Sequence, residues 1–158
     1  MYKRQSLYAL AGLNRRDKLS NEASLKYFLL GSLASCIFIY GVALVYVSYS
    51  LMSVYDFALA IAYTGPDLIP LTTFIGVLLI FVGLLFKIAA APFQSWAPDV
   101  YQGSPTGYVG YMASVAKAAS FIVIARICMV SIRFILEDFE PFFFAVIFLS
   151  VLVGSFFA

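Results

Sequence analysis

The chain has 158 residues, of which 63% are hydrophobic and only 11% are charged, and its formal net charge is +2. Soluble domains carry about 25% charged residues, so this composition excludes an ordinary soluble fold and predicts a protein embedded in a lipid bilayer. The low net charge, without a basic stripe interleaved with aromatic residues, excludes a nucleic-acid partner.

The first part of the chain predicts one spanning helix after a short polar loop. A partial helix is expected over residues 1–13, followed by a basic loop at 13–22. The apolar run at 23–48 predicts the spanning helix, with Ser20 or Asn21 as its N-cap.

An exposed segment at 49–70 follows, with a half-embedded piece expected around 52–62. The next apolar span, 70–100, is predicted to be broken at 89–92. The reason is Pro92, which lacks a backbone N–H and clashes with the preceding helical turn.

Two further spans are predicted over 106–134 and 141–158. In the turn before the first of them, Ser104 is placed as the N-cap and Pro105 as the first helical residue. Between the two spans lies an acidic patch formed by Glu137, Asp138 and Glu140.

Together these segments predict an all-α membrane protein, a polytopic transmembrane helix bundle with one discontinuous helix near Pro92. Residues 1–158 are expected to form a single transmembrane domain. The first loop carries the clustered basic residues, which are Arg15, Arg16, Lys18 and Lys26. The positive-inside rule therefore predicts that this loop and 97–105 face the cytoplasm or matrix, and that 49–70 and 133–140 face the opposite side.

Histidine is absent, and Cys36 and Cys128 lie far apart in apolar runs. We expect both cysteines to be small hydrophobic residues of helices rather than a disulfide or a metal site. The sequence has no GxGxxG segment and no cysteine cluster. No dinucleotide, haem or iron–sulfur centre is therefore expected in this chain.

Two lysines, Lys87 and Lys117, interrupt apolar runs and are the strongest functional candidates. A charge at the centre of a bilayer costs at least about 2.5 kcal/mol, and Lys117 is expected roughly 16 Å deep in its helix. Buried lysines can lose their charge through desolvation, so they can take up and release protons near neutral pH. The alternative is a structural role, as a buried ion pair or a hydrogen bond to backbone carbonyls.

Glu22 and Lys26 are four residues apart, in the favourable order for a pair on one helix face. A surface pair is the favoured interpretation, and the mouth of a proton path is the other. Asp99 is expected to be structural, holding a turn or pairing with a neighbouring subunit.

The segment FKIAAAPFQSWAPDVYQGSPTGYVGYMASVAKAASF (86–121) resembles the antiporter-like membrane subunits of respiratory complex I. Among these it is most similar to the subunit 2 branch of NADH dehydrogenase. The resemblance rests on the Phe-Lys pair at 86–87, Ala-Pro-Phe at 91–93 and the run at 96–106. A second match, ALAGLNRRDKLSNEASLKYFLLGSLASCIFIYG, covers 9–41.

The resemblance implies a role for each candidate. Lys87 is similar to the lysine beside the discontinuous helix of each proton channel, and Lys117 to the lysine that relays protons on the next helix. Glu22 and Lys26 match an acid and a lysine on the matrix side. NADH, FMN, the iron–sulfur centres and ubiquinone are expected on other subunits, and no cofactor in this chain.

The chain departs from the family pattern in three places. The family's membrane glutamate would fall near residues 1–3, which are Met1, Tyr2 and Lys3, and Gln94 stands where bacterial members often carry histidine. The second discontinuous helix is missing. A shortened or split form is expected, whose partners are other complex I membrane subunits, a separate chain with the missing parts, and membrane lipids.

The sequence thus predicts a membrane-arm subunit of complex I that contributes to proton translocation. A structural scaffold subunit without its own proton path, or a cation/proton antiporter subunit, are the alternatives. The abundance of Phe, Tyr and Ile favours the mitochondrial inner membrane, with the bacterial plasma membrane as the alternative.

Overall fold

A computed structural model of the protein describes residues 11–12, 18–51, 53–65 and 68–157. Most of the expected partial helix at 1–13, together with Arg15 and Arg16 of the basic loop, lies outside the described residues. The described part is helical and contains no strand. Its elements are α2 (Lys18–Tyr49), α3 (Val54–Thr64), α4 (Leu71–Ile88), α5 (Trp96–Gly103), α6 (Thr106–Tyr111), η2 (Met112–Ala116), α7 (Lys117–Arg126), η3 (Ile127–Ser131), η4 (Arg133–Ile135) and α8 (Leu136–Phe157).

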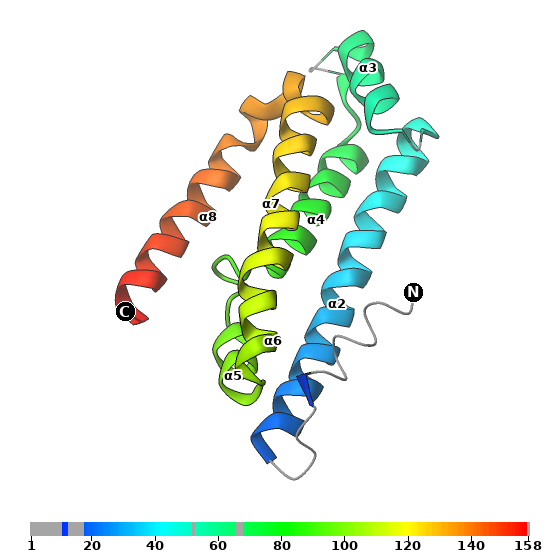
Figure 1. Ribbon diagram of the computed structural model, residues 1–158. Helices are drawn as coiled ribbons and strands as arrows, with labels where there is room; N and C mark the ends of the chain where they lie inside the picture. Colours follow the sequence, from blue (N-terminus) through cyan, green and yellow to red (C-terminus); the bar gives the residue numbers. More distant parts are fainter. Residues whose placement is uncertain (1–10, 13–17, 52, 66–67, 158) are drawn as a thin grey trace.

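In the described residues, four helical stretches are long and apolar enough to cross a membrane: Lys18–Tyr49, Leu71–Ile88, Thr106–Ser131 and Arg133–Phe156. They run alternately up and down, with α3 at one end of the bundle and α5 at the other (Figure 1). The predicted fold class, an all-α polytopic bundle with one discontinuous helix, is confirmed.

Helix α2 begins at Lys18, five residues earlier than the expected span at 23–48. The predicted N-cap is therefore wrong, because Ser20 and Asn21 both lie inside the helix. The Ser20 hydroxyl is buried and donates to the carbonyl of Ala11 at 3.0 Å. This side chain ties the helix to the preceding segment instead of capping it.

Helices α2 and α4 approach each other closely through small residues. A Cβ atom on Gly41 would lie 2.6 Å from the Gly76 carbonyl oxygen, and one on Gly76 would lie 2.9 Å from the Gly41 carbonyl oxygen. Gly83 meets Phe38 in the same way, at 2.7 Å. Such contacts are typical of helix pairs in lipid, where van der Waals packing replaces the hydrophobic driving force.

The break after α4 has a defined backbone course. Ala89 adopts the left-handed conformation with φ 56° and ends the helix, and the Ala91–Pro92 peptide bond is cis. The backbone groups released by the break find partners: the Trp96 indole donates to the Phe86 carbonyl at 3.1 Å, and the Ala91 N–H donates to the Ser150 hydroxyl of α8 at 3.1 Å. These bonds allow an irregular backbone to persist inside an apolar bundle.

Two predicted helix starts are wrong. Pro105 is the N-cap of α6, not its first helical residue, and Ser104 does not cap it. Helix α8 begins at Leu136, so the acidic patch lies within the helix and Pro141 is inside it. Glu137 and Asp138 lie in the first turn of α8, where carboxylates interact favourably with the helix dipole.

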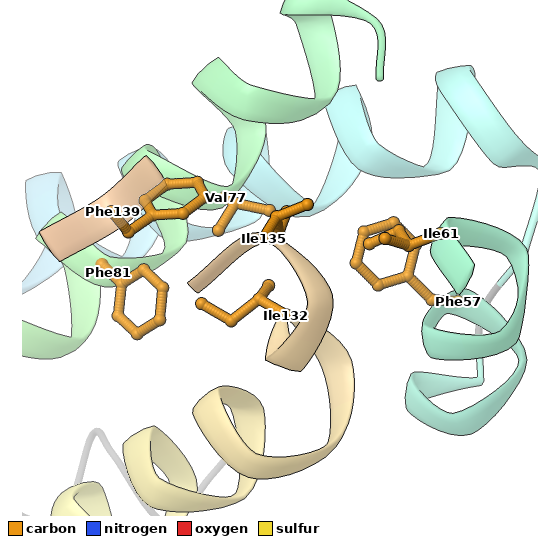
Figure 2. Packing of buried hydrophobic residues seen from close by; sticks show 7 residues of the cluster. All are labelled: Phe57, Ile61, Val77, Phe81, Ile132, Ile135 and Phe139. Atoms are coloured by element: carbon orange, nitrogen blue, oxygen red, sulfur yellow. The ribbon is translucent and has the colours of Figure 1, made fainter. Parts of the chain in front are cut away.

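The largest buried cluster lies at the α3 end and joins α3, α4 and the α7–α8 turn (Figure 2). Phe74 stacks on Phe139 at 4.5 Å between ring centroids, and Phe81 meets Phe143 edge-on at 5.0 Å. This packing holds α4 against α8 and leaves the opposite end of the bundle to α5. The members shown in Figure 2 are Phe57, Ile61, Val77, Phe81, Ile132, Ile135 and Phe139.

Candidate functional site

Lys87 lies in the last turn of α4, two residues before the left-handed Ala89 that ends the helix. It is half-buried, and its Nζ atom lies 5.0 Å from the centre of the Phe38 ring on α2. Two features favour a cation at this position: the carbonyl end of a helix and the face of an aromatic ring. The candidate lysine therefore sits directly at the break.

Lys117 is the first residue of α7 and follows the π-helical segment η2. It is half-buried, and its Nζ atom lies 5.6 Å from the centre of the Tyr101 ring on α5. In the described part of the chain Lys117 forms no ion pair. Its described contact partner is therefore an aromatic ring supplied by the short helix after the break.

The π-helical segment sets the direction in which Lys117 points. In an α-helix, residues five apart point about 140° away from each other, whereas the i→i+5 pattern of a π-helix brings them nearly into line. Met112 is buried against Trp96, Ala97 and Val100 of α5, and Lys117, five residues later, contacts Tyr101 of the same helix. The wide turn thus lets both residues face α5.

Lys26 forms ion pairs with two carboxylates. Its Nζ atom lies 2.7 Å from the Glu22 carboxylate and 2.6 Å from the Asp99 carboxylate. The side chains are 40%, 59% and 51% exposed for Lys26, Glu22 and Asp99 respectively, so these are solvated surface pairs whose strength is limited by screening. The structure brings Glu22 and Lys26 together as the sequence predicts.

Asp99 is a partner that the sequence did not identify. It lies 73 positions from Lys26, and no local pattern links two residues so far apart. The contact depends on Gly103, where a Cβ atom would come within 2.6 Å of both the Ala23 side chain and the Leu19 carbonyl oxygen. A glycine here lets α5 lie against the start of α2, which brings the two charges together.

Three polar side-chain atoms around α5 are buried without a hydrogen-bond partner among the described residues. They are Gln94 Oε1, the Tyr101 hydroxyl and Ser104 Oγ. Buried polar groups without protein partners are usually satisfied by ordered water. These atoms indicate a hydrated site in the segment between the break and α6. The sequence alone did not reveal it.

The four predicted site residues therefore occupy three places: Lys87 at the break, Lys117 above α5, and Glu22 with Lys26 at the surface beside Asp99. A primary amine at membrane depth can exchange a proton with water that enters at a break in a helix. These features define a helical membrane protein with titratable groups arranged around a discontinuous helix. Their roles in proton transfer stay predictions.

Residues 4–158 match the family described as NADH:quinone oxidoreductase/Mrp antiporter, transmembrane. The chain belongs to this family. The match covers nearly the whole chain and includes every predicted site residue.

Similar curated proteins are NADH-quinone oxidoreductase subunits N. The protein of Mycobacterium tuberculosis (strain H37Rv) is 42% identical over 150 residues, which are 94% of this chain and 28% of that protein. Subunit N 1 of Chloroherpeton thalassium is 43% identical over 151 residues, 96% of this chain and 31% of that protein. The chain thus spans about 30% of the length of the curated relatives it matches.

The fold is similar to that of chains in solved respiratory membrane complexes. Respiratory complex I from Thermus thermophilus, solved with bound aureothin, aligns with TM-score 0.63 and 43% identity over 76% of this chain and 25% of that chain. The archaeal membrane-bound sulfane sulfur reductase, a respiratory membrane complex, aligns with TM-score 0.68 and 31% identity over 79% and 25%. An antiporter-like membrane subunit of the subunit 2/N type is thus supported by family, sequence and fold.

Proposed function

We propose that this chain belongs to a membrane-arm subunit of a respiratory NADH:quinone oxidoreductase and contributes to proton translocation. Lys87 at the break of α4 is the observation that carries the proposal. A charge at membrane depth costs at least about 2.5 kcal/mol, and a broken helix can admit water to a lysine beside it. An amine in that position is suited to exchange its proton with water.

The partners in this proposal are the other membrane subunits of the complex. Redox chemistry belongs to those subunits, and this chain supplies titratable groups along the membrane. The named relatives are bacterial, which favours the bacterial plasma membrane over the mitochondrial inner membrane as the location.

A cation/proton antiporter is the second candidate, because the family description includes Mrp antiporters. The named relatives are subunits N of NADH-quinone oxidoreductase, which favours the respiratory complex. NADH-dependent proton uptake without a requirement for Na⁺ or K⁺ distinguishes the two candidates.

Replacing Lys87 by methionine removes the titratable amine and keeps an apolar side chain of similar length. In vesicles that contain the assembled complex, Lys87→Met is expected to lower the number of protons moved per NADH oxidised, without loss of the complex. Lys117→Ala is expected to act in the same direction but more mildly, since water can bridge a relay. The control is Lys18→Met, because Lys18 is exposed at the start of α2.

Normal stoichiometry in Lys87→Met contradicts the proposal. A loss of assembled complex, with normal pumping in the fraction that remains, instead favours the structural scaffold.

A further inference from the structure

We infer that the Tyr101 hydroxyl holds a water molecule through which Lys117 exchanges its proton. The inference rests on the proposed function and adds a positioning residue to it. It begins from two independent observations: the Lys117 amine lies over the Tyr101 ring, and the Tyr101 hydroxyl is buried without a partner among the described residues.

The Tyr101 ring is fixed in place by its neighbours. It meets Trp96 edge-on, with 6.3 Å between ring centroids. Trp96 is in turn anchored by its bond to the Phe86 carbonyl and by stacking on Phe86 at 5.5 Å. The break, Trp96, Tyr101 and Lys117 therefore form one continuous set of contacts. The phenol oxygen of a ring held in this way has a defined position.

Burying the Tyr101 hydroxyl oxygen without a hydrogen-bond partner costs free energy. A buried hydroxyl that gives up its bonds to water without finding new ones destabilises the fold. Gln94 Oε1 and Ser104 Oγ, on either side of α5 in the chain, are buried without described partners as well. Three such atoms in a segment of eleven residues are better explained by water than by three separate defects.

A phenol hydroxyl is suited to this position because it both donates and accepts a hydrogen bond. The Lys117 ammonium gives a proton to the bound water, and that water gives a proton to the next acceptor. Lys117 ends as a neutral amine, the water remains water, and Tyr101 exchanges no net proton. The tyrosine therefore acts by holding the water in line, not by ionising.

Tyr101→Phe tests this role. The substitution keeps the ring under Lys117 and against Trp96 and removes only the hydroxyl. When the hydroxyl removed has no protein partner, the loss is expected to leave the melting temperature unchanged or slightly raised. Proton movement through this path is expected to slow by about tenfold or more, with fewer protons moved per NADH and a larger solvent isotope effect on proton movement.

Tyr49→Phe is the matched control. The Tyr49 hydroxyl is also buried without a described partner, but its ring packs on Phe57 at the α3 end of the bundle. The same chemical change there is expected to leave pumping unchanged. Loss of pumping in both variants, or in neither, overturns the inference.

Lys87→Met in parallel separates this inference from the proposed function. If Lys87→Met lowers the proton stoichiometry and Tyr101→Phe does not, the water site is wrong while the proposed function stands. If Lys87→Met leaves stoichiometry unchanged, the proposed function fails first.

Discussion

Lys87 and Lys117 each lie over an aromatic ring supplied by another helix, Phe38 of α2 and Tyr101 of α5. The sequence identified both lysines from the cost of a charge in an apolar run. It did not identify the rings, because aromatic residues are abundant in this chain and nothing local distinguishes the two that meet a lysine. The side chains that tune the site are therefore visible only in the fold.

Trp96 supports the site through one side-chain hydrogen bond. Its indole N–H donates to the Phe86 carbonyl, which also accepts the Ala89 N–H at 3.1 Å, and its side chain is only 4% exposed. Trp96→Phe keeps an aromatic ring and removes one of the two donors to that carbonyl. The expected loss of stability is about 0.5–1.5 kcal/mol.

Thermal unfolding of the purified complex, or of the chain in detergent micelles, measures this loss. The control is Phe93→Leu, a substitution of a nearby residue that removes no side-chain hydrogen bond. An unchanged melting temperature in Trp96→Phe would contradict a stabilising role for the indole hydrogen bond.

At the scale of elements, the break at 89–92 was predictable and the π-helical segment was not. Pro92 is a local signal that acts wherever it stands. The turn at Met112–Ala116 contains no proline, and the chain widens there as Met112 packs between residues of α5. Tertiary packing sets such a turn, so a sequence pattern read along one helix cannot show it.

Removing one residue from the π-helical segment tests its role. Deletion of Ser114 is expected to restore an α-helical turn and to keep Lys117 facing α5, because Lys117 then follows Met112 by four residues, which lie about 40° apart around an α-helix. Proton movement is expected to stay close to that of the unmodified protein. Ser114→Ala keeps the residue count and serves as the control.

Proton movement that falls in the deletion as far as in Lys117→Ala would contradict this expectation, because it would show that Lys117 no longer faces α5. Helix content, followed by circular dichroism, is expected to be the same in the deletion and the control.

At the scale of the whole molecule, the existence and order of the spanning helices follow from apolar runs, and the fold class was predictable for that reason. The helix starts were not. Ser20 bonds to Ala11 instead of capping α2, and the three acids of the predicted loop join α8. The Lys26–Asp99 pair joins two distant segments, a contact that depends on the complete arrangement of α2 and α5.

Sidedness is the prediction that belongs to the whole molecule. Lys18 begins α2 and Ser53 caps α3, so they stand at opposite ends of the spanning helix α2. With Cys36 and Cys128 replaced by serine, Lys18→Cys is expected to react with an impermeant maleimide from the cytoplasmic side, and Ser53→Cys from the outer side.

Labelling of both positions from the same side would contradict the four-span topology. Reversed labelling would keep the topology and invert the orientation, which would show that the positive-inside rule misplaces this chain.

The central claim is that Lys87 exchanges a proton and does not merely carry a charge. Arginine keeps the positive charge but stays protonated in proteins, so Lys87→Arg separates the two roles. The decisive measurement is the number of protons moved per NADH oxidised by the assembled complex that carries Lys87→Arg. A value as low as that of Lys87→Met is the expected result, and a value equal to that of the unmodified protein would contradict the account.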